Sequence, residues 1–289
     1  MKISAMFKKG KPVFSLEIFP PKRTGNIQSI YDTVSKLATI QPDFISVTYG
    51  AGGSLVNNLT CEITSKIKKV YGIETVAHLT CVNSSKDDIV EMIKQYADNG
   101  IENVMALRGD NVPEAEKKTD FIHANQLAIE LQRACQDRLD ILGACYPEGH
   151  YESSDLISDI HNLKYKIGAG TDVLISQLFF DNELFYKFLN EVKSAGISIP
   201  VSAGIMPITT TKQIEKTVTL SGASLPYEFT KMISAYEDSP ELLYEAGIEY
   251  AATQIRDLLN HGVSGIHLYT MNNANVSLSI YDKIKDLLV

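Results

Sequence analysis

The chain alternates between short apolar runs and longer stretches in which apolar residues recur at helical spacing. Residues 13–20 have the composition of a buried strand, and residues 27–39 continue with helical periodicity. The predicted strands are 13–20, 43–50, 75–81, 103–110, 141–148, 173–180, 199–205 and 265–270. The predicted helices are 27–39, 56–70, 86–98, 121–136, 154–167, 182–194, a longer helical region to about residue 260, and 276–288. The pattern therefore predicts eight βα units.

Strands that are separated by helices pair in parallel through right-handed crossovers. Eight such units in 289 residues favour a (β/α)8 TIM barrel of the α/β class, and an open doubly wound sheet is the alternative. No linker or composition shift marks a second domain, although residues 221–243 form one long insertion before the last strand. We expect residues 1–289 to form a single barrel domain.

Composition narrows the class of protein further. A hydrophobic content of 44% can supply a large core, while the formal net charge of -8 argues against binding to nucleic acid or to an anionic membrane. The start of the chain has no secretory signal pattern, and no run of about 18 apolar residues occurs. The four cysteines have no C-x-x-C spacing, so we expect reduced, buried thiols. These features predict a soluble, cytoplasmic protein.

Polar residues gather at the predicted carboxyl ends of the strands, where the ligand site of a (β/α)8 barrel lies. They are Glu17, Thr48, Tyr49, His78, Arg108, Asp110, Tyr146, Glu148, His150, Gln177 and Tyr269. A single polar residue at a strand end is weak support, because strands commonly end in polar turns. Repetition of the pattern on most of the strands predicts an enzyme site.

Two of these positions raise specific questions of charge. Glu17 lies in an otherwise apolar strand, and burying a carboxylate is unfavourable unless it is paired, hydrogen-bonded or protonated. Arg108 and Asp110 flank Gly109 directly after another apolar strand. They either pair with each other or leave the Arg108 guanidinium to hold an oxyanion, and the sequence leaves both readings open.

Metal and nucleotide motifs receive little support. Glu17, His78, Asp110 and His150 could converge at one rim, but no pair has the spacing of a helix-borne metal motif, so no metal is predicted. "YGAGGSL" has Leu55 where G-x-G-x-x-G requires its last glycine, and no G-K-[ST] follows. "GAGT" at 168–171 is typical of a helix end and turn.

Eight short motifs, in order and at similar intervals, resemble the methylenetetrahydrofolate reductase family. They are "FSLEIFPPK", "ISVTYGAGG", "AHLTC", "ALRGD", "YPEGH", "SQLFFD", "AGIMP" and "HLYTMN". The resemblance covers essentially the whole chain, without an added regulatory domain, as in bacterial members. It implies an FAD-bearing barrel that passes a hydride from NADH or NADPH to flavin, and then to 5,10-methylenetetrahydrofolate to give 5-methyltetrahydrofolate for methionine biosynthesis.

The resemblance also implies roles for individual residues. Glu17 matches the general acid that protonates an amine as the folate ring opens, and its apolar strand predicts a raised pKa. Asp110 matches an aspartate beside the flavin and the pterin, so Glu17 and Asp110 are predicted as catalytic. The predicted folate contacts are Glu17, Asp110, Gln177 and Tyr269. The positions that match the flavin site are Thr48, Tyr49, Ala51, His78, Arg108, Gly109, Asp110, Ala124, Tyr146, His150, Asp159, Asn162 and Lys166.

The chain departs from the family pattern at three places. Asn273 stands where an arginine holds the folate tail, residues 208–211 (Ile-Thr-Thr-Thr) lack a substrate-stacking aromatic residue, and Tyr165 replaces a basic residue on the flavin-binding helix. Family members also commonly form homo-oligomers, which we expect here. A subunit fed by a protein donor such as ferredoxin, and a flavin- or folate-binding protein without turnover, are the alternatives. Retention of Glu17, Asp110 and Gln177 favours the enzyme.

Overall fold

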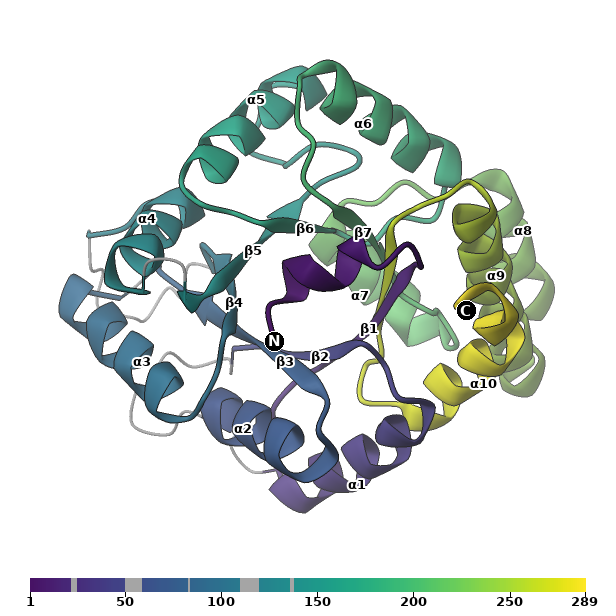
Figure 1. The fold of residues 1–289 in the computed structure, drawn as a ribbon. Coiled ribbons are helices and arrows are strands. Elements are labelled where there is room, and N and C mark those ends of the chain that lie inside the picture. The colour runs from purple at the N-terminus through teal and green to yellow at the C-terminus, as the bar shows by residue number, and fades with distance from the viewer. Residues whose placement is uncertain (22–24, 50–58, 83, 110–119, 136–137) are drawn as a thin grey trace.

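A computed structural model describes residues 1–21, 25–49, 59–82, 84–109, 120–135 and 138–289, and in it eight parallel strands close into a barrel (Figure 1). The strands are β1 Val13–Ile18, β2 Phe44–Val47, β3 Glu74–Thr80, β4 Asn103–Leu107, β5 Asp140–Cys145, β6 Val173–Ser176, β7 Val201–Ile205 and β8 Gly265–Tyr269. The last strand pairs with the first, with Glu17 opposite Tyr269. The predicted (β/α)8 barrel is therefore confirmed, and the open sheet is excluded.

Helices surround the barrel and separate successive strands (Figure 1). They are α1 Ile27–Leu37, α2 Leu59–Tyr71, α3 Lys86–Asp98, α4 Ala124–Cys135, α5 Leu156–Gly168, α6 Asn182–Ser194, α7 Thr211–Ser221, α8 Tyr227–Tyr236, α9 Pro240–Asn260 and α10 Ala274–Ile284. The long helical region predicted before β8 is three helices, α7 to α9. Prolines mark two of its boundaries, because Pro226 caps α8 and Pro240 begins α9, where the missing N–H has no cost.

Several predicted strands were too long at their carboxyl ends. The prediction of 13–20 becomes Val13–Ile18, and that of 103–110 becomes Asn103–Leu107. In both cases the pairing stops where the chain turns into a loop at the rim of the barrel. The described residues past these ends, such as Phe19, Arg108 and Gly109, are therefore rim residues, and the rim is where a ligand site is expected in this fold.

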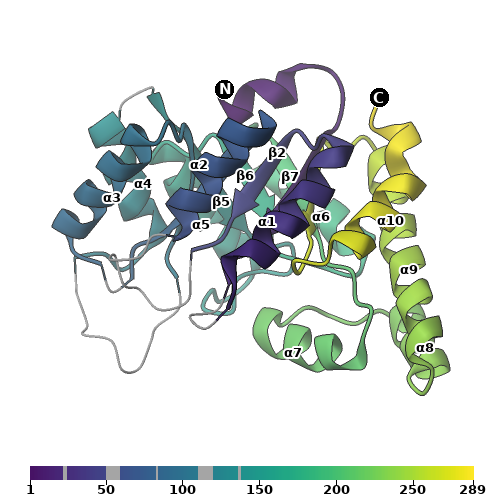
Figure 2. The same cartoon turned by 90° about the horizontal axis from the view of Figure 1, so that it is seen from below.

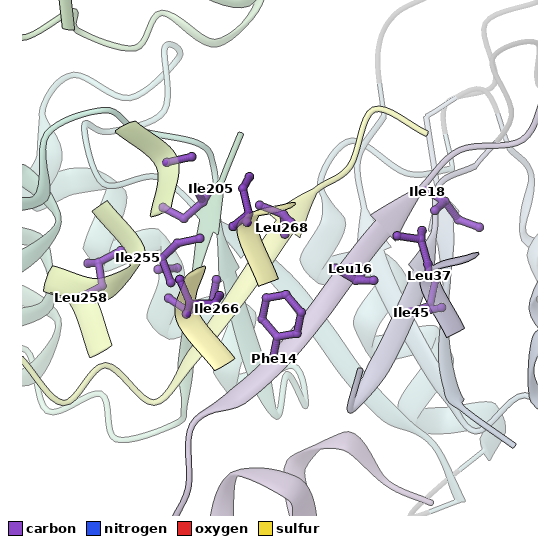
Figure 3. Close-up of a cluster of buried hydrophobic side chains, with 14 of the residues drawn as sticks. Phe14, Leu16, Ile18, Leu37, Ile45, Ile205, Ile255, Leu258, Ile266 and Leu268 are labelled. Atoms are coloured by element: carbon purple, nitrogen blue, oxygen red, sulfur yellow. The ribbon is translucent and has the colours of Figure 1, made fainter. Parts of the chain in front are cut away.

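Alternation along β1 separates the two faces of the barrel wall. Phe14, Leu16 and Ile18 point outward into the layer of helices, and Figure 3 shows Ile18 gathered with Leu37 of α1 and Ile45 of β2. The intervening residues point inward, because successive side chains of a strand face opposite sides of the sheet. Val13 thus joins an apolar layer inside the barrel, and Ser15 and Glu17 lie above it.

A short 3-10 helix, η1 (Ile3–Lys8), covers the amino end of the barrel and was not predicted (Figure 1). Its amides bind two polar side chains of the wall: Ile3 N donates to Asn103 Oδ1 (3.0 Å) and Ser4 N to Asp140 Oδ2 (2.6 Å). Figure 2 shows this end of the molecule opposite the end that carries α7. Because η1 occupies one mouth, the carboxyl ends of the strands are the side from which a ligand can approach the interior.

The cysteine prediction is confirmed. Cys61, Cys81, Cys135 and Cys145 are all buried, and they form no disulfide with one another. Burial raises the pKa of the Cys81 thiol to about 11 and that of Cys145 to about 12, so both are protonated, unreactive thiols at neutral pH. Within the described ranges, no helix has the length and apolar character needed to cross a membrane.

Candidate active site at the carboxyl ends of the strands

Glu17 lies between two histidines inside the barrel. Its Oε2 atom is 3.5 Å from His78 Nε2 of β3 and 3.6 Å from His267 Nε2 of β8, while 18% of the Glu17 side chain remains exposed. The three residues come from different strands, and each occupies an inward-facing position near the carboxyl end of its strand. The cost of placing a carboxylate in this apolar strand is thus offset by two groups that can carry positive charge.

His267 is held by a serine from the same strand as Glu17. Ser15 Oγ donates to the carbonyl oxygen of Ile266 (3.1 Å), so it accepts from His267 Nδ1 at 2.7 Å. This assigns the Nδ1–H tautomer to a neutral His267 and turns Nε2 toward Glu17 and Ser46 Oγ.

The expectation of a raised pKa for Glu17 is wrong in the ligand-free protein. Burial does raise the pKa of Glu17, but interactions with His267, His78 and Ser46 outweigh burial and leave the pKa below its ordinary value. The sequence showed the apolar neighbours on β1 and not the histidines that strand pairing brings to the carboxylate. Glu17 is therefore ionised at neutral pH unless a ligand changes its surroundings.

His78 is buried in β3, and the hydrogen-bonding capacity of its side chain is only partly used among the described residues. Tyr96 Oη donates to the main-chain oxygen of His78, whereas His78 Nε2 makes no hydrogen bond with the described residues although it lies near Glu17. Burial lowers the pKa of His78, and the nearby Glu17 charge only partly opposes this. A buried nitrogen without a hydrogen-bond partner is unfavourable in the free protein, and it can be satisfied by a bound ligand.

A second unsatisfied group lies on α5. Asp159 is buried; its Oδ1 accepts from Ser153 Oγ (3.0 Å), but Oδ2 makes no hydrogen bond within the part of the chain that the structure describes. On the same helix Lys166 Nζ donates to the main-chain oxygen of Ala144 (2.6 Å), and burial lowers the pKa of Lys166. Asn162 is exposed. His78 Nε2 and Asp159 Oδ2 both belong to residues that match the flavin site, so the chain fits a polar cofactor there.

Arg108 is paired with the loop that follows β5. Its guanidinium donates to the carboxylate of Glu152 and to Tyr151 Oη (2.9 Å), while Asp110 lies outside the described residues. Next to this pair, Tyr146 packs edge-on against His150 at 4.7 Å between ring centroids. The guanidinium and these rings form a partly exposed surface that can bind the phosphates or the flat ring of a ligand.

Gly109 follows Arg108 with a φ of 84°, and a Cβ at this position would lie 2.8 Å from Thr80 Cβ. Both the left-handed backbone and the close contact exclude a side chain. The glycine therefore lets the end of β4 turn tightly over the end of β3.

The remaining predicted residues lie at other strand ends. Thr48 follows β2 and its amide donates to Ile18 O (3.0 Å), Tyr49 is half-buried, and Ala124 begins α4.

Gln177 follows β6, and its Oε1 accepts from the amide of Leu178. Tyr269 ends β8 and donates to Ser176 O (2.7 Å). Burial and the charge of Glu17 raise the pKa of Tyr269 well above its usual value, so it is a neutral donor. Ala51, like Asp110, lies outside the described residues.

The three departures from the family pattern have local structural roles. Asn273 caps α10, because its Oδ1 accepts from Val276 N (3.3 Å). The amides of Thr209 and Thr210 both donate to Gln213 Oε1, which caps the start of α7. Tyr165 is largely exposed. At these positions the side chains hold helix ends or face solvent.

A cavity of about 820 Å³ lies beside the rim. It is lined by Thr209, Thr210, Thr211, Lys212, Glu237, Pro240, Glu241, Leu242, Leu243, Tyr244 and Glu245. None of these residues belongs to the cluster around Glu17 or to the predicted flavin positions. We therefore place the candidate site at the strand ends, where the unsatisfied polar groups and the shifted pKa values occur, and not in this cavity.

Sequence reasoning missed the polar residues that surround Glu17. Ser15, Ser46 and His267 have 0% exposure, and none was selected as a site residue. A signal was present, because Ser15 and Glu17 are two residues apart and so face the same side of the strand. His267 likewise stands alone in an apolar strand. Recognising the set required the pairing of β1 with β8.

The closed barrel and its polar cluster define a TIM-barrel protein with its site at the carboxyl ends of the strands. The sequence model of one family, described as Methylenetetrahydrofolate reductase, matches residues 2–285. The chain belongs to this family.

Individual relatives agree with the family match. The 5,10-methylenetetrahydrofolate reductase of Escherichia coli is 33% identical over 272 residues, covering 94% of this chain and 90% of that protein. Methylenetetrahydrofolate reductase (NADH) 1 of Arabidopsis thaliana is 34% identical over 284 residues, but this chain spans only 48% of its length. A solved structure of an uncharacterised Clostridium thermocellum protein that binds two copies of 5-methyl-5,6,7,8-tetrahydrofolic acid has the same fold, with a TM-score of 0.69, 14% identity and coverage of 99% of this chain and 100% of that chain.

Proposed function

We propose that this protein reduces 5,10-methylenetetrahydrofolate to 5-methyltetrahydrofolate, with FAD as its bound cofactor and NADH or NADPH as the hydride donor. Membership of the family and the similarity to the Escherichia coli enzyme over 94% of this chain support the reaction. The observation that carries the proposal is the position of Glu17, a carboxylate 3.5 and 3.6 Å from two imidazoles at the open end of the barrel. This cluster can store and deliver a proton.

FAD, when bound, would accept a hydride from the nicotinamide and pass it to the folate. In this chain His78 and Asp159 would hold it, because each has a buried polar atom that forms no hydrogen bond to the residues the structure describes. Arg108 and Lys166 supply positive charge for the dinucleotide. The other residues proposed to line the cofactor are Thr48, Tyr49, Ala51, Gly109, Asp110, Ala124, Tyr146, His150 and Asn162.

Glu17 would act as the general acid. Opening the five-membered ring of the folate requires protonation of an amine nitrogen, and a carboxyl group of suitable pKa provides that proton. Substrate entering the rim displaces water from Glu17, and desolvation is the effect that already raises its pKa. His267 Nε2 lies 3.6 Å from the same carboxylate and lowers its pKa in the absence of substrate.

Substrate binding would involve two further residues near Glu17. The phenol of Tyr269 is neutral and lies opposite Glu17 in the strand register. The Gln177 side chain is held against the next amide, which gives its NH2 group a defined direction. Asp110 remains a proposed contact to both folate and flavin. We also propose a cytoplasmic homo-oligomer with small-molecule substrates as its partners.

The test is to purify the protein, identify any released chromophore and assay turnover. We expect a yellow protein that releases FAD and reduces methylenetetrahydrofolate with NADH or NADPH. Parallel assays with reduced ferredoxin examine the alternative of a protein electron donor. A colourless protein that cannot be reconstituted with FAD, or a flavoprotein with no turnover from any of the three donors, would contradict the proposal.

A further inference from the structure

The loop after β8 is bonded to the segment that follows Glu17. Thr270 donates twice to the main-chain oxygen of Glu17, from its amide (3.2 Å) and from Oγ1 (2.6 Å). Asn272 then binds the next peptide group along: its Oδ1 accepts from Phe19 N (3.0 Å) and its Nδ2 donates to Phe19 O (2.9 Å). The pairing of β1 with β8 ends at Glu17 and Tyr269, so these contacts continue it beyond both strands.

The sequence after Glu17 explains why a side chain has to make this connection. Phe19 is followed by Pro20 and Pro21, which have no backbone N–H. Phe19 N is therefore the last backbone amide of this segment that can donate a hydrogen bond to β8 or to the loop after it. The Asn272 carboxamide offers one acceptor and one donor, and it matches both backbone groups of Phe19 as another strand would.

Asn272 holds this position in a strained loop. Met271 and Asn272 have φ values of 50° and 56°, so two consecutive non-glycine residues adopt the left-handed region. Asparagine tolerates that region better than most residues, and Asn272 N is satisfied by Thr270 Oγ1 (3.1 Å). Such backbone strain persists where neighbouring contacts over-determine the conformation, commonly beside functional sites.

We propose that Asn272 is a positioning residue for Glu17, which fixes the peptide at Phe19 and so holds the Glu17 carboxylate at the point from which it protonates the substrate. This inference rests on the proposed function. Asn272 does not touch the carboxylate; it restrains the backbone two residues beyond it. After loss of that restraint, the end of β1 is still held by Thr270, by the bond from Thr48 N to Ile18 O and by the strand ladder, but the peptide at Phe19 has lost both of its bonds to Asn272.

The test compares two half-reactions in Asn272→Gly and Asn272→Asp. Glycine accepts the left-handed backbone and removes both bonds, whereas aspartate keeps the acceptor for Phe19 N and loses the donor. Asn275→Gly, at an exposed position in the first turn of α10, is the control, and Glu17→Gln is the reference. In Asn272→Gly, reoxidation of the reduced flavin by methylenetetrahydrofolate should slow by about 10- to 100-fold, the effect of a small misplacement of a reacting group.

Flavin reduction by NADH or NADPH, flavin content and the unfolding midpoint should stay at the level of Asn275→Gly. The rate of flavin reoxidation in Asn272→Asp should lie between the rates in Asn272→Gly and in the parent protein. The double variant Asn272→Gly/Glu17→Gln should reoxidise no more slowly than Glu17→Gln alone, because a residue that acts through Glu17 has no effect without it.

Four results would overturn the inference. Normal reoxidation in Asn272→Gly while Glu17→Gln is slow would refute the positioning role alone. Equal losses in both half-reactions, together with flavin loss, would show that Asn272 only maintains the fold. If the losses of reoxidation rate in the two single variants multiply in the double variant, Asn272 acts independently of Glu17. If Glu17→Gln itself reoxidises normally, the proposed acid is wrong, and the positioning role falls with it.

Discussion

Glu17 Oε2 lies 3.6 Å from His267 Nε2, although the two residues are at opposite ends of the sequence. The contact exists because β1 and β8 close the barrel side by side, and both residues point inward. His267 is fully buried and its other nitrogen is bound to Ser15. The imidazole is therefore fixed in place beside the carboxylate that we propose as the acid.

The first prediction concerns Glu17→Gln. An amide cannot deliver the proton that opens the folate ring, but hydride transfer from NADH or NADPH to flavin does not need that proton. Stopped-flow reoxidation by methylenetetrahydrofolate should slow by roughly 10²–10⁴-fold, the usual contribution of a general acid. Flavin reduction should be unchanged, as in the control Glu183→Gln at an exposed site of α6. Equal slowing of both steps would show a structural role.

The second prediction concerns His267→Asn. His267 is the strongest of the interactions that lower the pKa of Glu17, so its removal leaves the effect of burial less opposed and raises that pKa. An acid with a higher pKa keeps its proton to higher pH. The alkaline decline in the rate of flavin reoxidation should therefore move to higher pH in His267→Asn. It should not move in the control His261→Asn, an exposed histidine. A shift to lower pH would contradict the assignment.

The third prediction concerns stability and His78. Burial lowers the pKa of His78 in the folded state, so the unfolded chain binds a proton first as the pH falls. The stability from keeping His78 neutral is fully present above about pH 6.5, the unfolded value, and is lost as the pH falls toward the folded pKa. Between pH 7.5 and 5.5, His78→Gln should reduce the pH dependence of the free energy of unfolding, by up to about 1.4 kcal/mol per pH unit.

Urea unfolding at a series of pH values measures this dependence. His123→Gln is the control, because His123 is an exposed residue directly before α4. An unchanged slope in His78→Gln would mean that His78 binds protons alike in the folded and unfolded states, which would contradict the lowered pKa.

The fourth prediction concerns Gly247 in α9. A Cβ at this position would lie 1.9 Å from the main-chain oxygen of Ile208, so the helix packs directly on the loop after β7. Gly247→Ala should lower the free energy of unfolding by about 1–3 kcal/mol, as overpacking does, although alanine is the better helix former. Gly168→Ala in α5, where no atom lies within 4 Å, is the control and should be neutral or slightly stabilising. Denaturant unfolding measures the stability of both variants. If Gly247→Ala is as stable as Gly168→Ala, the close packing at Gly247 is refuted.

Local patterns in the sequence were enough to predict the barrel. Apolar strands and amphipathic helices alternate with periods that depend only on neighbouring residues, so the bounds of α3 and α6 were predicted to the residue. The polar residues at the strand ends followed from the same pattern, because the chain leaves the apolar wall there. The 3-10 helix η1 was missed, since six residues carry no helical period of useful length.

The chemistry of Glu17 was decided only by the tertiary structure. Its sequence neighbours are apolar and suggested a raised pKa, whereas His78 and His267 lower it from strands that are distant along the chain. Asn272 reaches Phe19 in the same way. Each of these contacts depends on the register between strands and on closure of the barrel, and register is a property of pairs of strands that no single stretch of sequence contains. Local periodicity determined which elements form and which faces they bury; the pairing of those elements determined the charges that meet inside.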